Sequence, residues 1–110
     1  MKGMNLKENE EKAVLHLKKV LEEKFHILDF RIFGSKARGD ASPDSDVDVM
    51  IEVEEYSPAV ESAIDDTVYE TNLAHDCFIS TVIFNKKELE EGPLDESPLY
   101  KTIEREGVRV

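Results

Sequence analysis

The stretch from Gly34 to Asp48, GSKARGDASPDSDVD, lies between two apolar runs and constrains the fold more than any other segment of the chain. HILDFRIF precedes it and VDVMIEV overlaps its end. Both runs are rich in the branched and aromatic residues that favour strands, whereas the intervening SPDS consists of turn-forming residues. We therefore predict a strand over 27–33, a connection that brings the chain back, and a strand over 46–53.

Two aspartates, Asp46 and Asp48, open the second predicted strand with one residue between them. Side chains two residues apart in a strand point to the same face, so the two carboxylates are expected to stand side by side. Like charges at that distance repel unless a cation or a proton lies between them. Oxygen ligands that leave coordination positions open suit Mg²⁺, which recruits substrate phosphates. The pair therefore predicts a metal site that handles phosphate.

The residues that follow the first predicted strand have the character of a phosphate-binding turn. Gly34 lets backbone N–H groups approach a ligand closely, and Ser35 adds a hydroxyl where a short helical turn can begin. Lys36 and Arg38 add positive charge beside them. Each feature is weak evidence alone, but their order, with a strand on either side and two aspartates at the end, predicts binding of phosphate.

The rest of the chain predicts an alternation of helices and strands. Apolar residues at helical spacing indicate a first helix over 6–24, capped by Asn5 with Glu8, and Ser57-Pro58 starts a second. Further elements are expected as a strand over 77–84, a short helix from Asn85 to Gly92-Pro93, a helix from Ser97-Pro98 to Gly107, and an edge strand in the final VRV. This order predicts an α/β (α+β) fold, a small mixed sheet with helices packed on one face and the site on the other.

Length and charge limit the classes of function. With 110 residues the chain is expected to form a single domain over 1–110, too short to add a sizeable substrate-binding domain. Its formal net charge of −11 should repel DNA and RNA, because nucleic-acid binding depends on Lys and Arg contacts to phosphates. A protein, a small molecule or a basic partner is the expected second reactant.

The sequence offers no sign of export or of membrane insertion. The single cysteine, Cys77, cannot form an intramolecular disulfide, and the N-terminal MKGMNLKENEEK lacks an apolar signal-peptide core. No run of 18 or more apolar residues occurs. We therefore expect a cytoplasmic protein that makes no contact with a membrane. The sequence leaves the formation of a homo-oligomer open.

A glycine and a serine, ten residues and then D-x-D resemble the signature of the nucleotidyltransferases of the DNA polymerase beta superfamily. GSKARGD followed by SDVDVMIEV is similar to the minimal nucleotidyltransferases, small antitoxin-like proteins whose partner is a HEPN-domain ribonuclease. The resemblance implies the nucleotidyltransferase palm as the fold. It also implies that Ser35 binds ATP or another nucleoside triphosphate, and we expect Gly34, Lys36 and Arg38 to bind the same ligand.

The same resemblance implies that Asp46 and Asp48 hold two Mg²⁺ ions, and that a third carboxylate on a neighbouring strand removes a proton from the acceptor hydroxyl. Asp76 opens the apolar run CFISTVIF, and we expect it to be that third catalytic and metal-binding residue. Ser80 shares its face four residues later. If Ser80 instead occupies the place of the third acid, the enzyme could be impaired or inactive.

Two functions follow as expectations. The first is transfer of a nucleoside monophosphate, AMP from MgATP, to a tyrosine of a HEPN-type toxin, with the chain as antitoxin. The second is a binding protein of the same fold that neutralises its partner by contact, with weak or absent transfer. A small-molecule transferase is disfavoured, because it would normally need a second helical domain to bind the acceptor.

Overall fold

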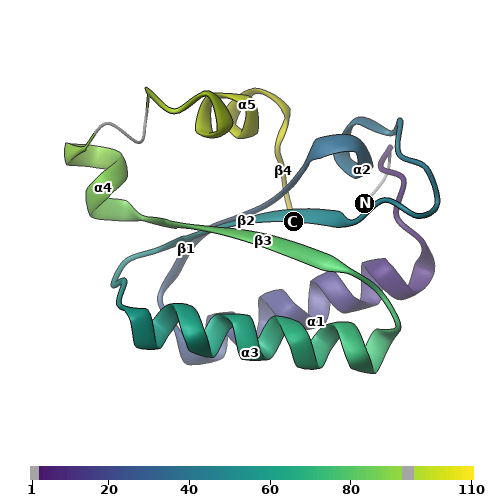
Figure 1. Ribbon diagram of the computed structural model, residues 1–110, viewed down its shortest axis with the longest axis horizontal. Coiled ribbons are helices and arrows are strands. Elements are labelled where there is room, and N and C mark those ends of the chain that lie inside the picture. Colours follow the sequence, from purple (N-terminus) through teal and green to yellow (C-terminus); the bar gives the residue numbers. More distant parts are fainter. Residues whose placement is uncertain (1–2, 93–95) are drawn as a thin grey trace.

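The computed structural model describes residues 3–92 and 96–110. The described part contains helices and strands in the alternating order that the sequence predicts (Figure 1). Their bounds are α1 Glu8–Lys24, β1 Ile27–Phe33, α2 Gly34–Arg38, β2 Val47–Val53, α3 Pro58–His75, β3 Ile79–Asn85, α4 Lys86–Glu91, α5 Pro98–Glu106 and β4 Val108–Arg109.

The strands form one mixed sheet in the order β3-β2-β1-β4. β1 runs antiparallel to β2, with Phe33 opposite Asp48, and antiparallel to β4. β2 and β3 are parallel, as a crossover through α3 requires. The predicted mixed sheet and the short edge strand in the C-terminal VRV are thereby confirmed.

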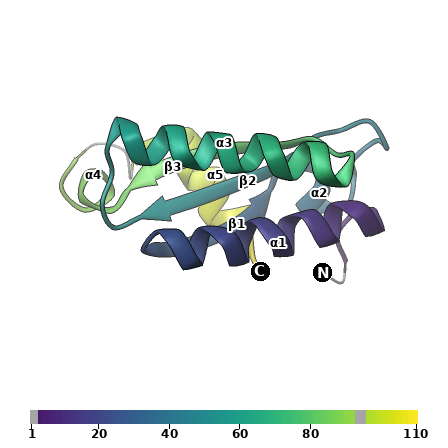
Figure 2. The ribbon, with the colours of Figure 1, turned by 90° about the horizontal axis from the view of Figure 1, so that it is seen from below.

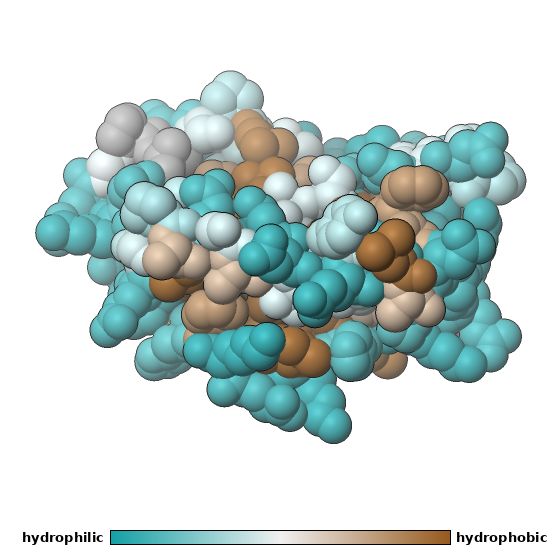
Figure 3. Space-filling view, turned by 60° about the horizontal axis from the view of Figure 1, so that its bottom comes forward, coloured by the Kyte–Doolittle hydropathy of each residue, from teal (hydrophilic) through white to brown (hydrophobic). Residues whose placement is uncertain are grey.

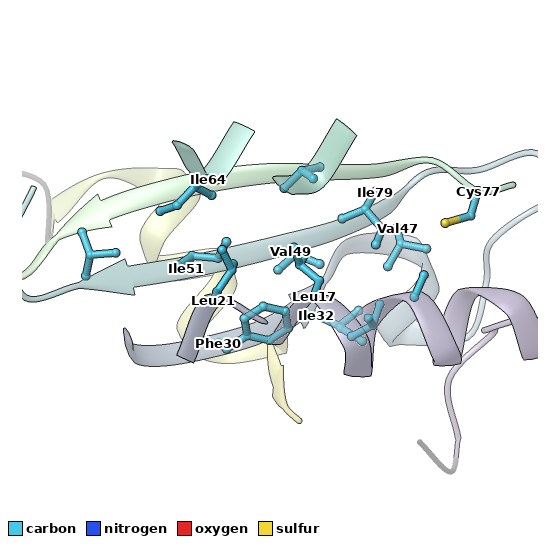
Figure 4. Close-up of a cluster of buried hydrophobic side chains, with 14 residues drawn as sticks. Leu17, Leu21, Phe30, Ile32, Val47, Val49, Ile51, Ile64, Cys77 and Ile79 are labelled. Carbon is cyan, nitrogen blue, oxygen red and sulfur yellow. The ribbon is translucent and has the colours of Figure 1, made fainter. Parts of the chain in front are cut away.

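Helices α1 and α3 lie side by side across one face of the sheet (Figure 2). Alternate residues of β2, namely Val47, Val49, Ile51 and Val53, are buried beneath them, as the period of two in a strand requires. Apolar side chains from both helices close this core, among them Leu17 and Leu21 of α1 and Ile64 of α3 (Figure 4). Because β2 buries its valines on the helix side, its intervening residues face the opposite side of the sheet.

That opposite face is less open than the sequence analysis expects. Helices α4 and α5 lie over one end of it (Figure 1), and a second apolar cluster fills the space between them and the sheet. Its buried members are Phe33, Met50, Phe84, Leu89 and Ile103. α5 is strongly amphipathic and buries Ile103, so it belongs against the sheet rather than in solvent. The face therefore stays accessible mainly toward α2 and the start of β2.

Several helix starts follow their predicted caps. The side-chain oxygens of Ser57, Asn85 and Ser97 accept hydrogen bonds from backbone N–H groups in the first turns of α3, α4 and α5. The first helix differs. It begins at Glu8, two residues late, and Asn5 does not cap it, because the Asn5 amide donates to the carbonyl of Ala41 at 3.1 Å.

The predicted end of α4 at Gly92-Pro93 is confirmed at Gly92, its C-cap residue, whereas Pro93 lies outside the described residues. Over residues 3–92 and 96–110, no helix combines the length and the apolar character needed to cross a membrane.

Candidate active site

Gly34 brings the backbone into close contact with Asp48. It directly follows β1 and opens α2 with φ of +75°, a left-handed conformation that favours glycine. A Cβ placed on Gly34 would lie 2.5 Å from Oδ2 of Asp48, closer than two non-bonded atoms can come. The Asp48 carboxylate therefore occupies the space that a side chain at position 34 would need, so only glycine fits there.

This contact predicts that Gly34→Ala impairs nucleotide binding. The added methyl would displace the Asp48 carboxylate and would also cost about 1–2 kcal/mol through the left-handed backbone. We expect a weaker affinity for MgATP, measured by titration calorimetry, and a lower melting temperature. Gly3→Ala is the matched control, because Gly3 has φ of +87° and nothing within 4 Å of its added Cβ. Equal nucleotide affinity in the two variants would contradict the close-contact account.

Asp46 and Asp48 interact electrostatically, as their spacing predicts. Asp46 is exposed just before β2, whereas Asp48 is partly buried within it. Burial raises the pKa of Asp48, and the negative charge of Asp46 raises it further. Arg38 acts in the opposite direction and lowers the same pKa, so its positive charge also reaches the carboxylate. The structure thus places Gly34 in contact with Asp48, and the charges of Asp46 and Arg38 act on the same carboxylate.

Arg38 is held in place at the rim of this group. Its Nε donates to Oδ2 of Asp40 at 3.2 Å, and its Nη1 donates to Oε2 of Glu106 at 3.1 Å. The Arg38 side chain remains 43% exposed, which leaves it accessible to a ligand. The bond to Glu106 joins α2 to α5 across 68 residues, and the sequence gives no local signal for it. Ser35 is partly buried beside Gly34, and its carbonyl accepts the N–H of Gly39 that ends α2.

The Lys36 side chain is buried against α1 instead of being exposed beside the expected nucleotide site. Its side chain is 1% exposed, and its Nζ lies 3.1 Å from Oε1 of Glu10 in α1. The same Glu10 oxygen accepts the backbone N–H of Lys7 at 2.8 Å. Lys36 therefore ties α2 to α1. Sequence analysis missed this pair, although Glu10 precedes Ala13 and Val14 on the apolar face of α1, where a charge signals a buried partner.

Asp76 also differs from its predicted place. The third strand begins at Ile79, and Asp76 is the C-cap residue of α3, with φ of 51°. In the parallel register the residue opposite Asp48 is Ser80. Ile79 is buried in the α1–α3 core, so Ser80 points to the face that carries Asp48. A strand start at Asp76, the basis for its expected role, is thus not observed.

The carboxylate pair fits a divalent cation in its chemistry. It offers hard oxygen ligands, and the pKa of Asp48 is raised first by burial and then by the negative charge of Asp46, which a cation would neutralise. Among the described residues, however, no group of three or more His, Cys, Asp or Glu side chains is arranged to hold a metal ion. Asp76 therefore does not join Asp46 and Asp48 in such a group. The two aspartates with partly exposed ligand positions suit a cation that also binds substrate phosphates.

Comparison with known proteins agrees with this geometry. The sequence profile of the nucleotidyltransferase domain family matches residues 14–109. A curated relative from Thermococcus cleftensis, "Protein adenylyltransferase MntA", is 42% identical over 55 residues, which cover 50% of this chain and 54% of that protein. A second, from Methanocaldococcus jannaschii, is named a "putative protein adenylyltransferase" and is 42% identical over 38 residues, 34% of this chain and 38% of its own length. The chain thus spans about half or less of these curated relatives.

Two solved structures share the fold. One is described as a "putative minimal nucleotidyltransferase" and aligns over 91% of both chains with a TM-score of 0.62 and 20% identity. The other, a "putative nucleotidyltransferase from Sulfolobus solfataricus", aligns over 97% of this chain and 90% of that chain, with a TM-score of 0.55 and 14% identity. The palm-like sheet and the paired aspartates define the class. The chain belongs to the nucleotidyltransferase domain family.

Proposed function

We propose that this protein transfers AMP from ATP to a tyrosine hydroxyl of a HEPN-type partner protein, and that it acts as the antitoxin of such a pair. The observation that carries the proposal is the contact between Gly34 and Asp48, which sets the backbone at the start of α2 directly against a carboxylate. The name of the Thermococcus cleftensis relative, a protein adenylyltransferase, supports a protein as acceptor. The net charge of −11 argues against a nucleic-acid acceptor.

Each residue of the site has a defined part in this reaction. The backbone at Gly34 and the Ser35 hydroxyl bind the triphosphate, and Arg38 neutralises part of its charge. The Asp46 and Asp48 carboxylates would hold two Mg²⁺ ions, which would stabilise the attacking and leaving oxygens when bound. The acceptor oxygen forms a bond to the α-phosphorus while the bond from that phosphorus to the bridging oxygen breaks. Pyrophosphate leaves, and the hydroxyl proton passes to a base.

The site lacks a carboxylate at the position on β3 next to Asp48, where it could act as the base, because Ser80 stands opposite Asp48. Neighbouring strands lie about 4.8 Å apart, so a carboxylate at position 80 would stand next to the pair. We expect Ser80→Asp to raise kcat of AMP transfer on the order of 10²-fold, a typical gain from a positioned general base. Asp76→Asn should leave kcat unchanged. If Asp76→Asn lowers kcat strongly while nucleotide binding persists, Asp76 is the third catalytic carboxylate.

The position of Ser80 opposite Asp48 also favours a second function. If the missing carboxylate makes transfer too slow to matter, the protein neutralises its partner by contact and keeps the nucleotidyltransferase fold as a scaffold. The two functions differ in whether the partner is covalently changed. Under the contact function, substitution of Asp46 or Asp48 leaves silencing of the partner intact.

The class of reaction is tested by the position of the label in ATP. The purified protein is incubated with Mg²⁺, the protein encoded by the adjacent gene as candidate partner, and ATP labelled at either the α- or the γ-phosphate. Nucleotidyl transfer moves the α-label to the partner and releases the γ-label in pyrophosphate. Labelling from γ-labelled ATP would indicate a phosphoryl transferase, and labelling from neither would favour the contact function.

A further inference from the structure

An apolar groove lies where the C-terminal half of α3 meets the start of β3. Tyr69, Leu73 and Phe78 line it together with Cys77, and its volume is about 260 Å³. These three side chains are 65%, 67% and 73% exposed, more than the other large hydrophobic residues of the described chain. In Figure 3 hydrophobic side chains gather on the side of the molecule where Figure 1 places the end of α3. Exposed apolar side chains that gather in one place mark a surface that binds something.

Negative charge lies in the groove and near it, and Asp76 is among the residues that line it. On α3, Asp65 and Asp66 precede Tyr69 by four and three residues, so they lie next to it on the helix surface. Glu70 precedes Leu73 by three residues and lies next to that side chain. Burial raises the pKa of Asp65, and the charges of Glu61 and Asp66 raise it further, which shows that the acids are crowded. The sequence of α3 contains no Lys or Arg. An occupant of the groove must therefore offer apolar side chains to its floor and basic side chains to its border.

The groove also lies next to the segment that leads into the candidate active site. The backbone N–H of Val47, the residue between Asp46 and Asp48, donates to the carbonyl of Phe78 at 2.9 Å. Cys77 and Phe78 line a second cavity of about 320 Å³, whose other wall includes Ser45 in the connection before Asp46. A protein bound in the groove is thus adjacent to the segment that carries the carboxylates.

From these observations we propose that the groove formed by Tyr69, Leu73 and Phe78 is the docking surface for the protein acceptor. The acceptor binds it through a segment that combines apolar residues with Lys or Arg, and this contact brings its hydroxyl to the site. The proposal rests on the proposed function for the identity of the acceptor. The docking itself requires no transfer and can be measured without nucleotide.

The test is a binding titration, without ATP, of the fluorescently labelled protein that the adjacent gene encodes. Leu73→Ser and Phe78→Ser are each expected to weaken binding about tenfold or more, as truncation of a buried anchor does. Glu70→Lys, which reverses one border charge, should weaken it about two- to fivefold. The control is Leu15→Ser, because Leu15 of α1 is 52% exposed and lies outside the groove. It should bind as the wild type does.

Unchanged affinity in Leu73→Ser and Phe78→Ser would overturn the proposal. A second result would also overturn it. If the wild type self-associates in sedimentation, and these variants are monomers that still bind the acceptor, the groove holds a second copy of this chain. The Asp46→Ala, Asp48→Ala double variant should bind the acceptor normally. A wild type that binds through the groove but transfers no AMP refutes the proposed function and leaves the docking surface standing.

Discussion

Asp48→Asn is expected to lower the rate of AMP transfer on the order of 10³-fold, the loss typical when a main electrostatic group is removed from a reaction centre. The amide keeps the size of the side chain but removes the charge that would hold a cation. Because Asp48 already lies against Gly34, the fold around it should not change. The measurement is single-turnover transfer of α-labelled AMP with saturating ATP and acceptor.

Two comparisons make this result specific. Asp46→Asn should also lower the rate of AMP transfer strongly, since the charge of the Asp46 carboxylate acts on Asp48. Glu22→Gln removes one acidic charge from the surface of α1, outside the site, and should transfer AMP at the wild-type rate. If Asp48→Asn retained most of the transfer activity, the carboxylate pair would not be the reaction centre.

Lys36→Met is expected to reduce the free energy of unfolding by about 3–5 kcal/mol, because it leaves the Glu10 carboxylate buried without its partner. The side chains of Lys36 and Glu10 are 1% and 6% exposed, so water cannot replace the lost contact. Chemical denaturation followed by circular dichroism measures the change. Because Lys36 follows Ser35, the loss should also loosen the turn that binds the triphosphate.

The surface pair Lys12–Glu8 provides the matched comparison. Its side chains are 67% and 85% exposed, and Lys12→Met should cost less than about 1 kcal/mol. A double variant, Glu10→Gln with Lys36→Met, should be more stable than Lys36→Met alone, since it removes the uncompensated charge. Similar costs for Lys36→Met and Lys12→Met would show that the buried pair contributes no more than a surface one.

Much of the fold follows from local sequence patterns. The strand over 27–33 has its predicted bounds, and Ser57-Pro58 and Ser97-Pro98 start helices, because a serine cap and a proline at the first helical position both favour a helix start. The alternation of buried Val47, Val49, Ile51 and Val53 with the residues between them depends only on the period of two in a strand. These features require no knowledge of distant contacts, so the sequence predicts them.

The features that the sequence does not predict depend on contacts between distant segments. Whether Lys36 faces a ligand or α1 is decided by Glu10, 26 residues away. The place of Asp76 depends on how α3 ends: the Asn72 side-chain oxygen accepts the backbone N–H of Ile79 at 2.8 Å, and this bond joins the helix to the first residue of the strand. An apolar run alone could not show that the strand begins at Ile79 and sets Ser80 beside Asp48.

The central claim is that the partner protein is covalently changed, and intact-mass spectrometry of the partner tests it most directly. The HEPN-type protein is incubated with this chain and MgATP, separated and weighed, and the modified residue is located by peptide mapping. The account predicts a mass increase of one AMP unit on a tyrosine, absent with Asp48→Asn. A partner that is bound and silenced while its mass stays unchanged would contradict it.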